Sequence, residues 1–235
     1  MSRPVVLAID GPAGAGKSTV AEHLARELDY FYFDTGALYR AVSVRCLDCA
    51  ADPSDEVAMQ DLVGQVEIQV RPPSVDDGRQ LDVFLNGRDV SHTIRTPEID
   101  ALVSKVAASP AVRAGLIDLQ RQQIQGKGTI LAGRDIGTVV CPDADLKIFL
   151  TASATERAHR RLVQVGGTPD QLAEMERLIV ERDRKDSSRA IAPLVAADDA
   201  IEVNTDGKGI DEVVRIIREL LAARLRERDA AQADR

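Results

Sequence analysis

The stretch Gly11-Pro12-Ala13-Gly14-Ala15-Gly16-Lys17-Ser18 decides the fold of this chain, because it satisfies the pattern G-x-x-x-x-G-K-[ST]. It follows the β-branched and apolar residues 5–9, which predict a buried parallel strand. It opens residues 17–28, where apolar side chains recur at helical spacing. Glycines let successive backbone N–H groups point at phosphate oxygens, and the helix N-terminus adds a partial positive charge. The stretch therefore predicts a phosphate-binding loop, or P-loop, for a nucleoside triphosphate.

The last residues of the P-loop supply side chains for the phosphates. We expect Lys17 to bridge the β- and γ-phosphates and the Ser18 hydroxyl to bind Mg²⁺. The alternative is a plain Gly-rich turn between a strand and a helix, which the complete motif in its proper context disfavours. The motif leaves open which molecule would accept a transferred phosphoryl group.

Four further apolar runs, at residues 31–33, 129–132, 146–150 and 200–203, alternate with segments of helical period. This order predicts an α/β fold of the P-loop NTPase type, in which helices flank a parallel sheet. Capping signals mark helix starts: Ser109 precedes Pro110, and Ser153 stands three residues before Glu156.

One region breaks the α/β alternation. Apolar and polar residues alternate over residues 66–70 and 81–85, and Asn86-Gly87 supplies a hairpin turn. We therefore expect a small antiparallel β insert at residues 62–90. The expected division is a core of residues 1–61 and 91–226, the insert, and a polar tail at residues 227–235.

Composition limits the class of protein. The net charge of −8 argues against a protein that binds nucleic acid through counterion release. No apolar stretch approaches the roughly 20 residues of a membrane span and no leader opens the chain, so we expect a cytoplasmic protein without a membrane partner. Because no apolar helix face is left over, we expect a monomer.

The three cysteines are too few, and odd in number, for a secreted disulfide framework. Cys46 and Cys49 form a C-x-x-C pattern inside a helical run. No second pair and no nearby histidine accompany them, so we interpret them as buried thiols rather than a redox or zinc site.

Two polar segments follow strands of the predicted sheet. Asp34-Thr35-Gly36-Ala37-Leu38-Tyr39-Arg40 begins where the second strand ends, and Gly133-Arg134-Asp135-Ile136-Gly137-Thr138 follows the third. Parallel sheets place ligands beyond the carboxyl ends of their strands, so we expect Arg40 to clamp an acceptor phosphate, with Arg134 and Asp135 in the same crevice. The alternatives are an ordinary turn with a solvated Arg40 and a salt-bridged Arg134–Asp135 loop.

Arginines gather in the last third of the chain. Arg157, Arg160 and Arg161 are spaced to share one helix face, where like charges destabilise a helix unless an anion offsets them. A second basic stretch at residues 182–189 follows the Gly166-Gly167 helix end. We interpret residues 153–189 as a short helical lid that closes over triphosphate, the alternative being a solvated charged face.

The sequence closely resembles bacterial cytidylate kinases. The resemblance rests on residues 9–19, 34–40, 94–96, 110–113, 133–138, 156–161 and 182–194. It implies an adenylate-kinase-like core, ATP as the phosphoryl donor, CMP and dCMP as acceptors, and an insert that forms the acceptor-side domain. The ATP-binding residues it implies are Gly11, Pro12, Ala13, Gly14, Ala15, Gly16, Lys17, Ser18, Thr19 and Arg157, and the catalytic residues are Lys17, Arg157, Arg160 and Arg161.

The same resemblance implies how CMP is held. Ser104, Arg113 and Asp135 contact cytosine with help from Arg189, Asp186 contacts the ribose, and Arg40, Arg134 and Arg182 bind the phosphate. Thr35 stands where relatives carry Ser or Thr, so it keeps a hydroxyl contact to CMP. Asp34 is a further candidate that contacts Mg²⁺ through water. Cytosine presents an amine donor where uracil presents a carbonyl, so a carboxylate at position 135 favours CMP over UMP.

Two other functions compete with this interpretation. A P-loop kinase for another small acceptor, such as UMP or shikimate, has the same donor machinery. A nucleotide-dependent switch of the small GTPase kind reads guanine with an N-K-x-D loop, and Val203-Asn204-Thr205-Asp206 lacks the lysine.

Overall fold

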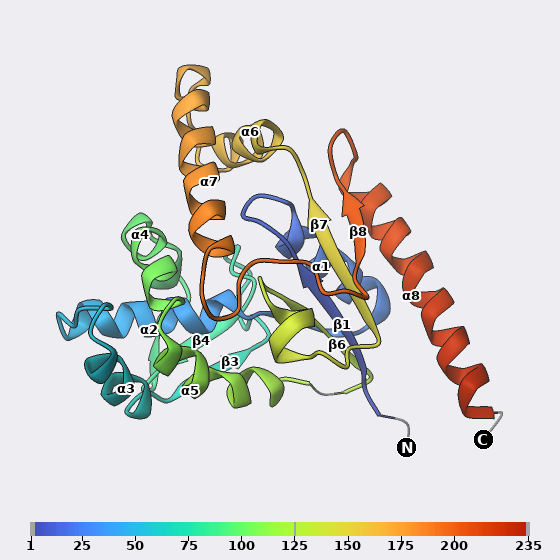
Figure 1. Cartoon of the computed structure of the whole chain (residues 1–235), viewed down its shortest axis with the longest axis horizontal. Helices are drawn as coiled ribbons and strands as arrows, with labels where there is room; N and C mark the ends of the chain where they lie inside the picture. The colour runs from blue at the N-terminus through green and yellow to red at the C-terminus, as the bar shows by residue number, and fades with distance from the viewer. Residues whose placement is uncertain (1–2, 125, 234–235) are drawn as a thin grey trace. The chain divides into compact units, whose positions relative to one another are not determined.

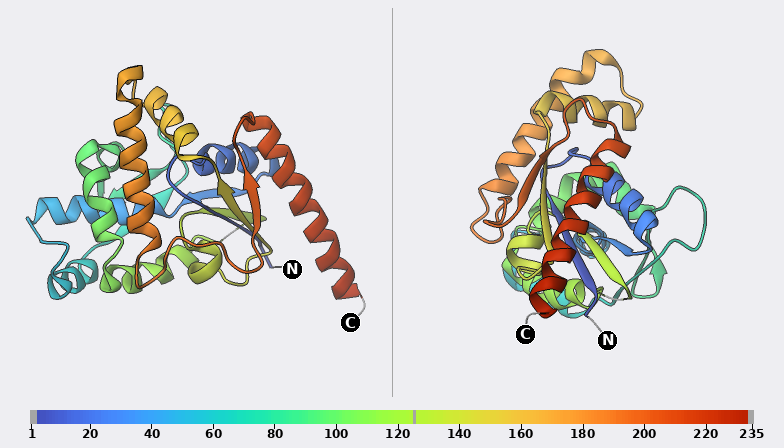
Figure 2. Two further views of the ribbon diagram at one scale, coloured as in Figure 1. Left: turned by 45° about the horizontal axis from the view of Figure 1, so that its top comes forward. Right: turned by 90° about the vertical axis from the view of Figure 1, so that its right-hand side faces the viewer.

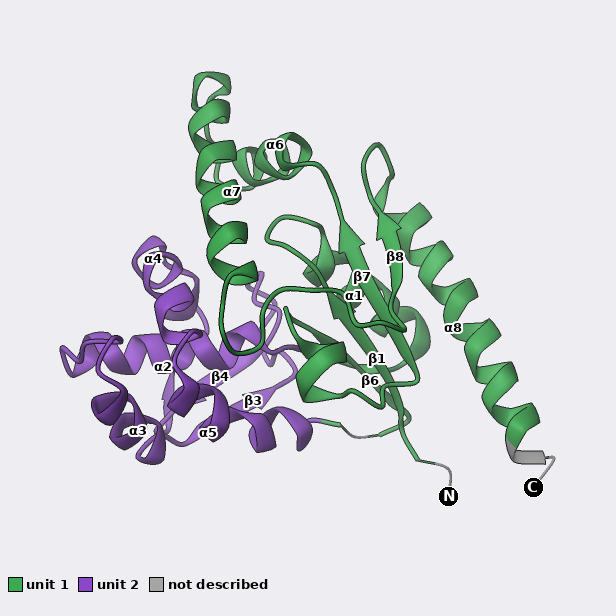
Figure 3. Cartoon of the chain, in the orientation of Figure 1, with its two compact units in different colours: residues 1–32, 124–235 green, residues 33–123 purple. Residues whose placement is uncertain are grey.

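The structure is a computed structural model that describes residues 3–124 and 126–233. It divides into two compact units, of which unit 1 comprises residues 1–32 and 124–235 and unit 2 comprises residues 33–123 (Figure 3). The chain passes from unit 1 to unit 2 inside the strand Phe31–Asp34.

A five-stranded sheet carries the P-loop. Its strands are β1 (Val5–Asp10), β2 (Phe31–Asp34), β6 (Gly128–Ala132), β7 (Leu146–Thr151) and β8 (Ile201–Asn204). They lie in the order β2-β6-β1-β7-β8 (Figure 1). Strand β1 pairs in parallel with β6 and with β7, and β7 pairs in parallel with β8. The predicted α/β fold is confirmed, and β1 lies centrally, so the P-loop leaves the sheet between the loops that follow β6 and β7.

The helices of unit 1 fall into two groups. Helices α1 (Lys17–Leu28) and α8 (Ile210–Ala233) bury their apolar stripes against the sheet in one core cluster, which includes Leu24 and Ile217. Helices α6 (Ala154–Gln164) and α7 (Leu172–Ser187) pack against each other as a hairpin, joined through the 3₁₀ turn η3 (Pro169–Gln171) (Figure 2). The π-helix η2 (Ile136–Val140) follows β6. Helix α8 extends to Ala233, so the expected polar tail is helical to that residue, and residues 234–235 lie outside the described residues.

Unit 2 combines four helices with a small antiparallel sheet. The helices are α2 (Gly36–Asp48), α3 (Glu56–Gly64), α4 (Pro97–Val106) and α5 (Pro110–Arg121), with the 3₁₀ turn η1 (Thr93–Arg95). The strands are β3 (Ile68–Arg71), β4 (Asp82–Leu85) and β5 (Arg88–Asp89). The two strand pairs are antiparallel, as predicted.

Local signals set several element boundaries in unit 2. Asn86 and Gly87 adopt φ angles of 50° and 78°, which a two-residue hairpin turn requires. Ser109 accepts a hydrogen bond from the backbone N–H of Val112 and so caps α5, as predicted. The expected start of the insert at residue 62 falls inside α3, because Asp55 caps that helix and the helix continues to Gly64.

The C-x-x-C pattern lies at the end of α2. Cys46 is buried and its Sγ lies 3.8 Å from Sδ of Met59, whereas Cys49 is exposed. The interpretation of both residues as buried thiols is therefore wrong for Cys49, because α2 ends at Asp48 and the following residue turns out to solvent. Among the described residues, no helix has both the length and the apolar character needed to cross a bilayer.

Candidate active site

The backbone of the P-loop is shaped by glycines, at which a side chain would be strained or would clash with neighbouring residues. Gly11 has a φ of 143°, and a Cβ added there would lie 2.2 Å from the carbonyl oxygen of Leu150 in β7. Gly14 has a φ of 79°, and an added Cβ would lie 3.0 Å from Cβ of Arg157. The loop is therefore held tightly between β7 and α6, with its backbone available to a ligand on the remaining side.

Lys17 and Ser18 lie at the start of α1. Lys17 is buried, and its ammonium donates hydrogen bonds to the carbonyl oxygens of Gly11 at 2.7 Å and Pro12 at 2.8 Å. A buried cation thus lies inside the turn that the glycines form. Ser18 is half-buried and Thr19 is exposed on the first turn of the helix.

The donor set at the P-loop fits Mg²⁺ in the manner typical of P-loop proteins. Within residues 3–124 and 126–233, no three His, Cys, Asp or Glu side chains come together as a metal site. Mg²⁺ prefers oxygen ligands and keeps several waters, so one serine hydroxyl together with substrate phosphates suits it. Ser18 is the residue that would hold it here.

Of the three arginines predicted to be catalytic, two lie against the P-loop. Arg157 is buried and donates to the carbonyl oxygens of Ala13 at 3.1 Å and Ala152 at 3.0 Å. Its guanidinium also forms a 2.6 Å ion pair with Asp183 of α7. Arg157 therefore links both helices of the hairpin to the P-loop, and Asp183 is a partner that the sequence analysis did not identify.

Arg160 and Arg161 diverge from one another. Arg160 donates to the side chain and the carbonyl oxygen of Thr205, which follows β8, and an added Cβ at Gly16 would lie 3.9 Å from its Nη1. Arg161 donates to Gln164 on its own helix. The structure thus brings Arg157 and Arg160 together at the P-loop and gives Arg161 a local contact.

The start of α6 departs from the predicted capping box. Ser153 accepts the backbone N–H of Glu156, as expected. In a capping box the Ser153 N–H would donate to the Glu156 side chain, but here it donates to the carboxylate of Asp206 at 2.9 Å. The Glu156 carboxylate instead pairs with Arg160. The loop after β8 therefore holds α6 at its first turn.

Three of the residues expected to bind CMP form one ion-pair cluster in unit 1. Asp186 is buried and accepts from Arg134 at 3.1 Å and from Arg189 at 2.5 Å. The ion-pair partner of Arg134 is therefore Asp186 of α7, in contrast to the alternative of a salt-bridged Arg134–Asp135 loop. Arg182 is half-buried one turn before Asp186.

Asp135 is buried directly after Arg134 and precedes the π-helix η2. A second buried carboxylate, Asp10 at the end of β1, accepts the backbone N–H groups of Ile136 at 2.9 Å and Gly137 at 2.8 Å. Burial, opposed by these hydrogen bonds, raises the pKa of Asp10 to about 6, and the charge of Asp135 adds to the rise. Asp10 is not among the site residues predicted from the sequence, although it stands immediately before the P-loop.

The raised pKa of Asp10 makes a prediction about stability. The pKa of Asp10 is about 6 in the folded chain and 3.8 for an ordinary aspartate, so the protonated carboxyl stabilises the fold. This stabilisation is fully present below pH 3.8 and is lost as the pH rises through about 6. Relative to the Asp10→Asn variant, the wild-type free energy of unfolding should fall by about 2 kcal/mol between pH 4.5 and 7.5. Denaturant titrations of both proteins at each pH measure this difference, and a constant difference would contradict the assignment.

Unit 2 contains the remaining predicted residues. Arg40 on α2 donates to the carbonyl oxygen of Ile94 at 2.8 Å and pairs with Asp100 of α4 at 2.5 Å. Asp34 accepts from Arg95 at 3.1 Å. Burial would raise the pKa of Asp34, but the charges of Arg95 and Arg40 outweigh it and hold that pKa below its usual value. Thr35 is buried between Asp34 and α2.

Two further predicted residues lie on α4 and α5. Arg113 is buried, donates to the carbonyl oxygen of Ala107 at 3.0 Å, and lies 5.5 Å from the ring centroid of Tyr39. The ring supports the guanidinium through a cation–π contact. Ser104 is half-buried on α4. The Arg113 guanidinium is thus held by a backbone carbonyl and by the Tyr39 ring.

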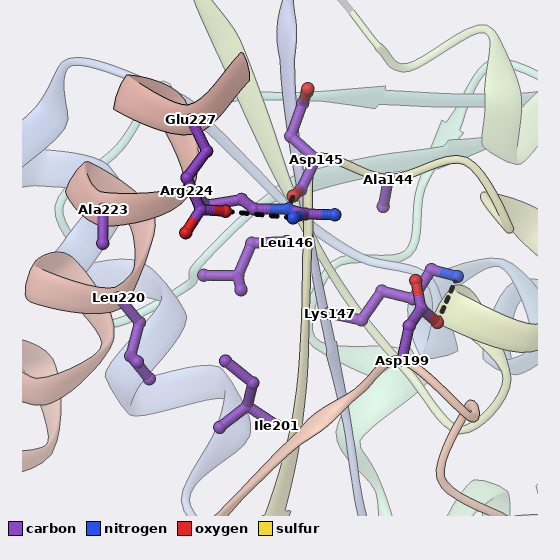
Figure 4. Close-up of a pocket in the computed structure, with 10 residues that line it drawn as sticks. All are labelled: Ala144, Asp145, Leu146, Lys147, Asp199, Ile201, Leu220, Ala223, Arg224 and Glu227. Atoms are coloured by element: carbon purple, nitrogen blue, oxygen red, sulfur yellow. Dashed lines mark hydrogen bonds and ion pairs between the residues drawn. The ribbon is translucent and has the colours of Figure 1, made fainter. Parts of the chain in front are cut away.

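A pocket of about 330 Å³ lies at the amino ends of β7 and β8, opposite the strand ends that carry the P-loop (Figure 4). Its charged side chains are paired, Lys147 with Asp199 at 2.7 Å and Arg224 with Glu227 at 3.1 Å. It contains none of the predicted site residues. We therefore place the candidate active site at the P-loop and not in this pocket.

The central strand, its glycine loop and the lysine enclosed by that loop define a P-loop nucleotide-binding protein. Residues 7–223 match the sequence model of the family described as Cytidylate kinase. The chain belongs to the cytidylate kinase family.

Two curated relatives and one solved structure illustrate the similarity. A bifunctional pantoate ligase/cytidylate kinase of Synechococcus elongatus (strain ATCC 33912 / PCC 7942 / FACHB-805) is 49% identical over 224 residues, which cover 92% of this chain and 42% of the relative. The chain thus spans less than half of that bifunctional protein. A cytidylate kinase of Limosilactobacillus reuteri (strain DSM 20016) is 44% identical, covering 94% of this chain and 96% of the relative. A shikimate kinase structure from Bacteroides thetaiotaomicron aligns with a TM-score of 0.47 at 13% identity, covering 93% of this chain and 98% of that chain.

Proposed function

We propose that this protein is a cytidylate kinase that transfers the γ-phosphoryl group of ATP to CMP, and also to dCMP, giving CDP or dCDP and ADP. The observation that carries the proposal is the P-loop, whose backbone surrounds the Lys17 ammonium and is contacted by Arg157. Family membership and the name of the Limosilactobacillus reuteri relative support a cytidine nucleotide as the acceptor.

The proposed reaction is a direct in-line transfer. An oxygen of the CMP phosphate forms a bond to the γ-phosphorus, while the bond from that phosphorus to the β,γ-bridging oxygen breaks and ADP leaves with the electron pair. Phosphate oxygens are already anionic, so alignment and charge neutralisation are the main requirements and no general base is needed. Lys17, Arg157, Arg160 and Arg161 are the residues we assign to charge neutralisation. Mg²⁺, when bound at Ser18, would neutralise charge on the triphosphate.

The binding residues remain as the resemblance implies. For ATP these are residues 11–19 and Arg157. For CMP they are Thr35, Arg40, Ser104, Arg113, Arg134, Asp135, Arg182, Asp186 and Arg189. We keep Asp34 as a residue that contacts Mg²⁺ through water, residues 62–90 as the acceptor-side insert, and residues 153–189 as the lid.

The proposal is tested with a panel of acceptors. ATP and Mg²⁺ are incubated with CMP, dCMP, UMP, AMP, GMP and shikimate, and ADP release is followed. CMP and dCMP should give the highest kcat/KM, because Asp135 suits the cytosine amine. CMP among the poorest acceptors would contradict the proposal, and UMP as the best acceptor would favour the alternative of a uridylate-directed kinase.

We also propose a cytoplasmic monomer without nucleic-acid or membrane partners. The net charge of −8 supports the absence of nucleic acid, because a broad basic face is the usual basis of such binding. Sedimentation of the purified chain would measure its oligomeric state directly.

A further inference from the structure

Two buried carboxylates lie at opposite ends of the central strand. Asp145 accepts the backbone N–H of Val6 near the start of β1 and also pairs with Arg3 at 2.8 Å and Arg228 at 3.3 Å. Asp10 ends the same strand, at the P-loop side, and its two carboxylate oxygens accept backbone N–H groups of η2. Asp145 thus forms ion pairs with two arginines, whereas both carboxylate oxygens of Asp10 bind backbone N–H groups.

The backbone that Asp10 holds begins one residue after Asp135. On the other side of Asp135, the N–H of Gly133 donates to the carbonyl oxygen of Ile9 at 3.0 Å. Residues 9 and 10 therefore fix positions 133, 136 and 137, and the two residues between these points are Arg134 and Asp135. An added Cβ at Gly137 would lie 3.0 Å from Cδ of Lys147 and 3.4 Å from Oδ2 of Asp10, so a larger residue at this position would press on the Lys147 side chain.

A carboxylate is the side chain that suits this task. Each of its two oxygens accepts one N–H group, whereas the amide of asparagine offers a single acceptor and would place its own donor against the second N–H. Burial of the charge is costly, so its presence calls for a role that a neutral residue would not fill. A π-helix, η2, begins directly after Asp135. π-helical turns are rare in proteins and, where they occur, are frequently found at functional sites.

We infer that Asp10 is a positioning residue for acceptor selection, which holds the Asp135 segment in the orientation that distinguishes cytosine from uracil. This inference rests on the proposed function, in which Asp135 contacts the base. Asp10 acts through Asp135 and does not itself touch the acceptor.

The test compares kcat/KM for CMP with kcat/KM for UMP. Asp10→Asn should lower this ratio by about tenfold, since the interaction energy between neighbouring residues is commonly large enough for a tenfold change. A ratio cancels any effect on the adjacent P-loop, because both acceptors share the same ATP site. The matched control is Asp145→Asn, which removes a buried carboxylate that also accepts a β1 N–H and should leave the ratio unchanged.

A double variant separates positioning from a general structural role. In an Asp135→Asn background, Asp10→Asn should leave the remaining ratio unchanged within about twofold, because the residue it positions no longer discriminates. If Asp10→Asn is insoluble, Asp10→Ser is measured in the same way. An unchanged ratio in the single variant, or an equal fall in both backgrounds, would overturn the inference. A wild-type protein without preference for CMP would instead overturn the proposed function.

Discussion

Replacing Lys17 with methionine should lower kcat for CDP formation by about 10³-fold or more at saturating ATP and CMP. Methionine matches the length of the lysine stem and so fills the same buried space. It lacks the ammonium that lies within 2.8 Å of the P-loop carbonyl oxygens. The loss therefore isolates the charge that we propose stabilises the phosphoryl group during transfer. Steady-state measurement of CDP by chromatography gives the result.

Lys147→Met is the matched control for this variant. Lys147 is equally buried, pairs with Asp199, and lines the pocket at the amino ends of the strands (Figure 4). Its loss removes a buried cation from strand β7 without touching the P-loop, so kcat should change by less than about threefold. If folded Lys17→Met protein forms CDP at the wild-type rate, the P-loop is not the catalytic site and the proposed function fails.

Local sequence signals predicted the elements that carry the site. The run before the P-loop is apolar at each of residues 5–9, and the structure has β1 from Val5 to Asp10. Helix α1 begins at Lys17, the next-to-last residue of the P-loop motif. Periodicity and turn chemistry suffice here because each signal spans only a few neighbouring residues.

Partners distant in sequence were not predictable in the same way. Arg134 pairs with Asp186, which is 52 positions away, and Asp10 binds a backbone N–H that is 126 positions away. Asp206 takes the place expected for Glu156 at the start of α6, across 53 positions. Sequence spacing names the residue types available to a site, but chain topology decides which of them meet. Asp183 and Asp10 could not be predicted as partners, because a single carboxylate near a motif carries no pattern of its own.

Replacing Asp135 with alanine should reduce the preference for CMP over UMP by about 10²-fold or more. Asp135 is only 5% exposed, so a base that opposes its carboxylate with a carbonyl has no water to relieve the mismatch. Alanine removes this penalty for UMP and also removes the acceptor for the cytosine amine. The two effects act in the same direction on the ratio of kcat/KM values.

The ribose provides an internal reference for the Asp135→Ala variant. We assign the sugar to Asp186, so the ratio of kcat/KM for CMP to that for dCMP should stay within about threefold of wild type. Asp145→Ala serves as the second reference, because it removes a buried carboxylate of 7% exposure that precedes β7 and lies away from the P-loop. A variant that lost selectivity for sugar and base alike would indicate general disorder of the site. Full CMP-over-UMP selectivity in a folded Asp135→Ala protein would exclude this carboxylate as the base-reading group and, with it, the positioning role of Asp10.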